Sequence, residues 1–89
     1  MTDPIPERLR FPCDYPVKVL VRAEPGVREQ VDAVVQRHAG PIGSESVTER
    51  SSAQNRFLGI TYVIHARDEA QIAKLFGALK SCPQVLMVL

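Results

Sequence analysis

Two histidines and two cysteines carry the side chains that most often act as metal ligands, general bases or nucleophiles. His38 and His65 lie in different segments, and neither belongs to a metal-ligand spacing such as H-x-x-x-H. Serine and aspartate are present, but no pattern joins them to a histidine as a catalytic triad. We therefore predict a protein that is not an enzyme, with no catalytic residues, no metal site and no cofactor.

The cysteines, Cys13 and Cys82, are predicted to be free thiols, as is usual in a reducing compartment. In the fold derived below, each lies near the start of a strand, and these two strands run antiparallel side by side. Their starts would be about 20 Å apart at 3.3 Å per residue, whereas a disulfide needs Cα atoms within about 7 Å. Cys82 has only Lys80 nearby to activate it, so we expect an ordinary thiol rather than a redox sensor.

Two ends of one predicted helix hold candidate binding residues. Glu24, Gly26 and Val27 lie at its start, where backbone amides can bind an anion. They would hold the carboxylate of a small effector, with Glu24 opposing it or selecting an ammonium group, or they simply connect strand and helix. Arg37 and His38 lie in the last turn, where cations stabilise the helix dipole. That structural role is favoured over a contact with an anion or a partner protein.

The length of 89 residues is sufficient for one domain. The net charge is only +1, so charge does not favour nucleic acid or an anionic membrane as a partner. The first dozen residues contain charges and prolines without an apolar core, which argues against a signal peptide. The longest apolar run, residues 85–89, is too short to cross a bilayer. We expect a soluble cytoplasmic protein.

Strands are predicted from side chains that alternate at period two. Residues 57–66 (FLGITYVIHA) are predicted to be the central strand, with Tyr62 among the side chains that face the helices. Residues 15–23 alternate in the same sense and form the first strand. The polar residues 44–54 form a short edge strand or a loop, and residues 84–89 form the last strand.

Apolar residues at helical spacing predict two helices. The first carries the stripe Val27, Val31, Val34, Val35 and His38, and the second carries Ile72, Leu75, Phe76 and Leu79. Asp68 and Gln71 have the spacing of a capping box at the start of the second helix. Helix and strand lengths of this kind can bury one face of a sheet.

The order β-α-β-β-α-β is typical of an α+β ferredoxin-like sandwich. With right-handed crossovers it gives a four-stranded antiparallel sheet in the order 4-1-3-2, with both helices on one face. Residues 14–89 form this single domain, and the proline-rich residues 1–13 are predicted to be a flexible leader.

The helix-free face of the sheet is a candidate partner surface. By alternation it carries Lys18, Leu20, Arg22, Phe57, Thr61, Val63 and His65. The last strand adds either Val85, Met87 and Leu89 or Leu86 and Val88. The last strand is apolar on both faces and lies at an edge of the predicted sheet. Either the leader covers it, or it forms an interface with a second copy or an enzyme. RNA binding is disfavoured, because the RNA-recognition domain of this topology reads bases with several aromatic side chains and this face offers only Phe57.

Three segments carry a family resemblance: Phe11-Pro12, residues 34–39 (VVQRHA) and the C-terminal Met87-Val88-Leu89. They are similar to segments of the YbeD-like family of small bacterial cytoplasmic proteins. The resemblance extends over nearly the whole chain, with equivalent elements in the same order. The resemblance implies a ferredoxin-like fold close to the ACT regulatory domains, which bind amino acids or similar effectors inside allosteric enzymes. It also implies genes that often lie near those for lipoate attachment. This chain is expected to differ from an ACT effector domain in standing alone, with no enzyme attached.

Together these features predict a non-catalytic regulatory or adaptor protein that binds a protein, a second copy of itself or a small effector. The binding surfaces would be the open sheet face and the first strand-to-helix turn. The alternative is a free-standing ACT-like sensor of an amino acid or small carboxylate metabolite. Neither nucleic acid nor a membrane is expected as a partner.

Overall fold

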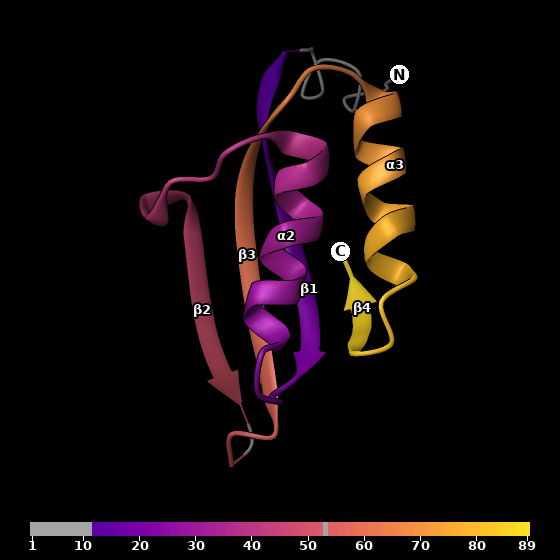
Figure 1. Ribbon diagram of the computed structural model, residues 1–89. Helices are drawn as coiled ribbons and strands as arrows, with labels where there is room; N and C mark the ends of the chain where they lie inside the picture. The colour runs from indigo at the N-terminus through magenta and orange to yellow at the C-terminus, as the bar shows by residue number, and fades with distance from the viewer. Residues whose placement is uncertain (1–11, 53) are drawn as a thin grey trace, which may run out of the picture.

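The computed structural model describes residues 12–52 and 54–89, which form one antiparallel sheet with two helices on one side (Figure 1). The strands are β1 (Cys13–Arg22), β2 (Val47–Ser52), β3 (Phe57–Ala66) and β4 (Val85–Val88). The helices are α2 (Val27–Ala39) and α3 (Glu69–Lys80), and a short 3-10 turn, Ser44–Ser46, precedes β2. The strand order β2-β3-β1-β4 is the order 4-1-3-2 predicted from the sequence.

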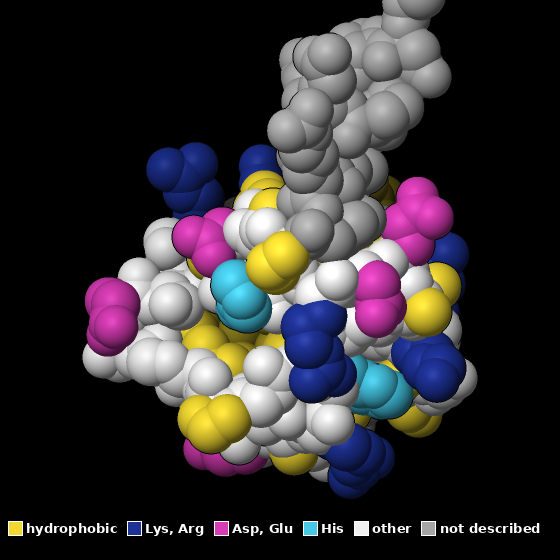
Figure 2. Space-filling view, turned by 90° about the horizontal axis from the view of Figure 1, so that it is seen from above, with side chains coloured by type: hydrophobic (Ala, Val, Ile, Leu, Met, Phe, Trp, Pro, Cys, Tyr) yellow, Lys and Arg dark blue, Asp and Glu magenta, His cyan; other side chains and the backbone are white. Residues whose placement is uncertain are grey.

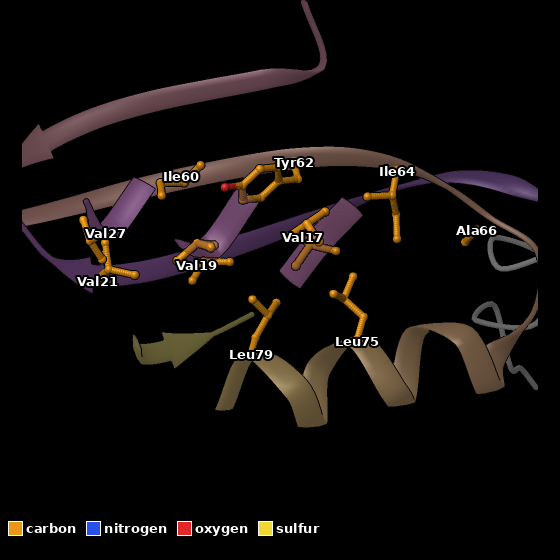
Figure 3. Packing of buried hydrophobic residues seen from close by; sticks show 12 residues of the cluster. Val17, Val19, Val21, Val27, Ile60, Tyr62, Ile64, Ala66, Leu75 and Leu79 are labelled. Atoms are coloured by element: carbon orange, nitrogen blue, oxygen red, sulfur yellow. The ribbon is translucent and has the colours of Figure 1, made fainter. Parts of the chain in front are cut away.

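The core lies between the sheet and the two helices. Leu75 and Leu79 of α3 point toward the valines of β1, as Figure 3 shows. The other buried apolar side chains are Val17, Val19, Val21, Val27, Val31, Val35, Ile60, Tyr62, Ile64 and Ala66. Val17, Val19 and Val21 of β1 and Ile60, Ile64 and Ala66 of β3 are buried at alternate positions, so the period-two interpretation of both central strands is confirmed. Ala23, predicted on the same face as the valines, follows the end of β1 and is exposed.

The start of α3 is held by the predicted cap. Asp68 Oδ1 accepts a hydrogen bond from the Gln71 amide at 2.8 Å. Gln71 Oε1 accepts from the Arg67 amide at 2.6 Å, one residue earlier than in the standard capping box. The Gln71 side-chain nitrogen donates to the His38 carbonyl oxygen at 2.9 Å. One buried glutamine therefore ties the start of α3 to the end of α2.

The first strand is longer than predicted. β1 begins at Cys13, which the sequence interpretation assigned to the leader, because Cys13 pairs with Ala66 at the end of β3. The rest of the predicted leader, apart from Pro12, lies outside the described residues. Both Cys13 and Cys82 are free thiols, as predicted.

The last strand does not alternate as predicted. Leu20 pairs with Met87 but the next residue, Val21, pairs with Val85, so the register shifts between them. Val85 and Val88 consequently both pack against the core, whereas Met87 lies on the open face. Neither predicted set of open-face residues is therefore correct, because a strict period of two does not survive a bulge.

Candidate functional site: the open sheet face

The open sheet face is built from rows of side chains that cross all four strands. In one row Met87 of β4 pairs with Leu20 of β1, Leu20 with Gly59 of β3, and Gly59 with Arg50 of β2. Residues directly opposite in antiparallel strands present their side chains on the same face. The row is therefore apolar at β4 and β1, lacks a side chain at β3, and carries a cation at β2.

The neighbouring row carries the second cation. Lys18 of β1 exchanges backbone hydrogen bonds with Leu89, at 3.1 and 2.8 Å, and pairs with Thr61 of β3. Thr61 in turn pairs with Thr48 of β2. The two rows together enclose a hollow on the open face, which we call the open-face hollow.

The open-face hollow has a volume of about 480 Å³. It is lined by Lys18, Val19, Leu20, Thr48, Arg50, Gly59, Ile60, Thr61, Met87 and Leu89. Two of these residues are basic and none is acidic. Glu49, the acidic neighbour of Arg50, is opposite Ile60 and forms an ion pair with Arg28 of α2, on the helix side of the sheet.

Large apolar side chains are exposed on and beside this face. The exposed fraction is 43% for Val63, 50% for Met87 and 65% for Leu89. Both helices lie on the opposite side of the sheet in Figure 1, so no described element covers these side chains. Met87 and Leu89 place exposed apolar surface at the open-face hollow, which makes this face the candidate binding surface.

Gly59 is not demanded by the fold. A Cβ atom added there would meet only the Arg50 carbonyl oxygen, at 3.6 Å, which is an ordinary van der Waals contact. Glycine weakens the interior of a strand and often marks a place where a ligand or another backbone approaches closely. The missing side chain leaves room in the open-face hollow, beside Leu20 and Thr61.

The predicted open-face residues are divided between places. Leu20 lines the open-face hollow, and Arg22 and Phe57 pair with each other at the adjacent end of the sheet. Val63 and His65 lie toward the other end, on a separate hollow of about 210 Å³. His65 Nδ1 is 3.6 Å from a carboxylate oxygen of Asp14, and both side chains are exposed.

Arg37 and His38 are not on the sheet face. They lie at the end of the helix layer, where Figure 2 shows Lys and Arg side chains beside a histidine. Together with residues from the start of α3 they line a hollow of about 280 Å³, completed by Arg67, Asp68, Ala70, Gln71 and Lys74. Their predicted role as a partner contact stays a prediction, and it belongs to a different surface from Leu20.

The first strand-to-helix turn contains Gly26 at the start of α2. Gly26 has φ of 78°, a left-handed conformation that favours glycine. The Val27 side chain is buried, so only its backbone faces the turn, and its amide donates to the Glu24 carbonyl oxygen at 3.1 Å. Glu24 is exposed. Binding of a small effector by these three residues stays a prediction.

A polar network that the sequence analysis did not foresee lies on the helix side of the sheet. The buried Tyr62 hydroxyl donates a hydrogen bond to Asp32 Oδ1, which also accepts from Arg28 Nε at 2.8 Å. Arg28 forms a second ion pair with Glu49 of β2. Burial, followed by the bond to Asp32, raises the pKa of Tyr62, and the bond to Asp32 raises the pKa of Arg28. The network joins β2, β3 and α2.

Metal-ligand clusters and membrane-spanning helices are absent from the part of the chain that the structure describes. Across residues 12–52 and 54–89, no three His, Cys, Asp or Glu side chains are grouped to hold a metal ion. Neither helix of this part of the chain is long and apolar enough to cross a membrane. The prediction that the protein has no cofactor and no enzymatic activity stays a prediction.

The architecture defines an ACT-like ferredoxin-like domain. It resembles the crystal structure of the ACT domain from GTP pyrophosphokinase of Chlorobium tepidum, with a TM-score of 0.61 and 13% sequence identity. The match covers 86% of this chain and 97% of that domain. At this identity the likeness shows the fold, which is the one predicted.

The chain belongs to the bacterial family described as protein of unknown function DUF493, which matches residues 6–89. A UPF0250 protein of Hahella chejuensis is 37% identical over the full length of both chains. One from Pseudomonas aeruginosa is 35% identical over 94% of this chain and 91% of the relative. Membership of this family, with its ACT-like fold, agrees with the YbeD-like resemblance seen in the sequence.

Proposed function

We propose that this protein is a non-catalytic cytoplasmic regulatory or adaptor protein that binds a partner protein through its open sheet face. The observation that carries the proposal is the open-face hollow, an apolar recess bordered by the exposed side chains Met87 and Leu89. In a ferredoxin-like sandwich the helices bury one face of the sheet, so the other face is available for binding. The ACT-like fold supports a regulatory role by analogy alone.

Site-specific photo-crosslinking in bacterial cells tests this proposal. A photoreactive amino acid replaces Leu20 in the hollow, and in a matched control it replaces Ala73, which is exposed on α3. We expect a discrete cross-linked species from position 20 and none from position 73. Equal labelling from both positions would refute the proposal. A cross-link within the same chain, to residues 1–11, would show that the protein covers its own face and would also refute it.

A sensor of an amino acid or small carboxylate is the second candidate function. The observation that favours it is the open turn at Gly26, where an added Cβ would meet no described atom within 4 Å beyond the glycine and its two chain neighbours. A thermal-shift screen of the pure protein is the test, because a ligand at 100 times its dissociation constant adds about 2.7 kcal/mol to stability. For an effector bound at this turn, we expect the thermal shift to be smaller in Glu24→Gln if Glu24 binds its ammonium group, and larger if Glu24 repels its carboxylate. The exposed control Glu69→Gln should give the same shift as the unaltered protein. A shift that is identical in all three proteins places the ligand elsewhere.

A further inference from the structure

We propose that the open-face hollow receives an extended segment of the partner protein in which a large apolar side chain lies between two carboxylates. The inference rests on the proposed function, a partner-binding sheet face, and names the chemistry that the partner must present. It is carried by three features of the hollow: its apolar lining, its two cations and its central glycine.

The apolar side chain of the partner would lie over Gly59. Leu20 lies beside this position in the same row, with Met87 next to Leu20, and an added Cβ at Gly59 would meet only the Arg50 carbonyl oxygen, at an ordinary contact distance. The fold therefore gains nothing from glycine here and forgoes the better strand propensity of a branched residue. Close approach of another chain supplies the missing reason, because only a position without a side chain leaves that depth.

The two cations set the spacing of the partner's carboxylates. Lys18 is opposite Thr61 on one side of β3, and Arg50 is opposite Gly59 on the other side. Two strand spacings across and two residues along the sheet separate their Cα atoms by about 12 Å. An extended segment places side chains at positions i and i+4 on one face, about 13 Å apart. Carboxylates at i and i+4, with the apolar residue at i+2, match this geometry.

A second copy of this chain is the wrong occupant for the hollow. In a face-to-face dimer whose two-fold axis passes through the hollow, each hollow would meet the same hollow of the other copy. Lys18 and Arg50 would then be brought toward the cations of the other copy, with no acidic lining residue to compensate. Like charges placed opposite each other are destabilising. Asp14, the acidic residue that shares this face, pairs with His65 at the far end of β1 and β3.

A small molecule is also a poorer occupant than a protein segment. Small-molecule sites bury about 70–90% of the ligand surface, which requires walls on several sides. The open-face hollow is bounded by a sheet on one side only, and the exposed apolar side chains of Met87 and Leu89 lie at its border. A segment held on a larger partner can cover both the hollow and this neighbouring surface.

Synthetic peptides and fluorescence anisotropy test the inference. The probe is a short labelled peptide with the core Glu-Ser-Leu-Ser-Glu, and three controls alter one feature each. Lys-Ser-Leu-Ser-Lys reverses the charge, Glu-Ser-Ser-Ser-Glu removes the apolar side chain, and Ser-Glu-Leu-Glu-Ser moves the carboxylates to the opposite face. We expect each control to bind about tenfold more weakly or worse, and binding of the probe to weaken as salt screens the charges.

Variants of the full-length protein complete the test. Lys18→Glu and Arg50→Glu should each weaken probe binding several-fold, and their combination should favour the lysine peptide. Lys80→Glu, on exposed α3 surface, is the matched charge control and should leave probe binding unchanged. Gly59→Val should fill the hollow and reduce binding about tenfold or more, while its thermal midpoint stays at or above that of the unaltered protein.

The outcomes separate this inference from the proposed function. The inference of an acidic segment is wrong if the Glu-Ser-Leu-Ser-Glu probe does not bind, or if the lysine peptide binds equally well. If the photo-cross-link from position 20 still forms in the otherwise unaltered protein but not in Gly59→Val, the proposed function stands without the acidic segment. If the cross-link is absent as well, both are wrong.

Discussion

Replacing Tyr62 by phenylalanine should destabilise the protein by about 1–2 kcal/mol. The Tyr62 side chain is 0% exposed, and phenylalanine fills the same space without the hydroxyl that donates to Asp32. A hydrogen bond to a charged group contributes about 1.5–3 kcal/mol to stability. The expected loss lies around the lower end of that range, because the Asp32 side chain is 28% exposed and keeps its bond to Arg28.

Thermal unfolding followed by circular dichroism measures this effect. For a domain of this length each kcal/mol lowers the midpoint by about 4–8 °C, so a fall of about 4–16 °C is expected. Tyr15→Phe is the matched control, because Tyr15 is half-buried on β1 and its hydroxyl bonds to none of the described residues. Its midpoint should shift by less than the equivalent of about 0.5 kcal/mol.

Two results would refute the role of the Tyr62 bond. One is an equal loss of stability in both tyrosine variants, which would show that the hydroxyl partner does not matter. The other is additivity in a double-mutant cycle of Tyr62→Phe with Asp32→Ala, because groups that share a bond should couple by at least about 0.5 kcal/mol.

Three further predictions concern the ionisation of Tyr62 and two positions of α3. Because the pKa of Tyr62 is raised in the folded protein, the stability that this tyrosine adds is complete below about pH 10 and is lost at higher pH. The urea midpoints of the native protein and Tyr62→Phe should therefore converge above about pH 10, and parallel curves would contradict this. Asp68→Ala should lower the free energy of unfolding by about 1 kcal/mol in urea, whereas Asp68→Asn keeps a capping oxygen; equal losses would exclude the cap. Gly77→Ala should raise the thermal midpoint, by about 1 kcal/mol in stability, because Gly77 is within α3 and the added Cβ would meet nothing within 4 Å beyond its chain neighbours and the nearby helix backbone; an unchanged midpoint would contradict this.

The topology could be predicted because its signals are local. Residues 57–66 alternate without interruption, and the strand in the structure has the same bounds, Phe57–Ala66. The Asp68 and Gln71 cap likewise needs only a spacing of three residues. Once the six elements are in order, right-handed crossovers leave one compact arrangement of the sheet.

The floor of the open-face hollow could not be predicted, because it depends on register between strands distant in sequence. Leu20 was identified from alternation within β1 alone. Arg50 and Thr48 were not, since residues 44–54 were compatible with a loop and gave no partner for Gly59. The bulge opposite Leu20 and Val21 is invisible in the apolar run of the last strand, where every residue suits either face. Network partners such as Asp32 depend on how α2 is rotated over the sheet.

The stability network and the candidate binding face are coupled through β2. Adjacent residues on this strand face opposite sides of the sheet: Glu49 pairs with Arg28 on the helix side, and Arg50 borders the open-face hollow. A slip of one residue in the β2–β3 register would exchange them, because strand side chains alternate. It would put a carboxylate into the hollow and set Arg50 against Arg28. The ion pair between Arg28 and Glu49 therefore favours the register in which Arg50 borders the hollow, so a contact on the helix side helps to define the charge of the open face.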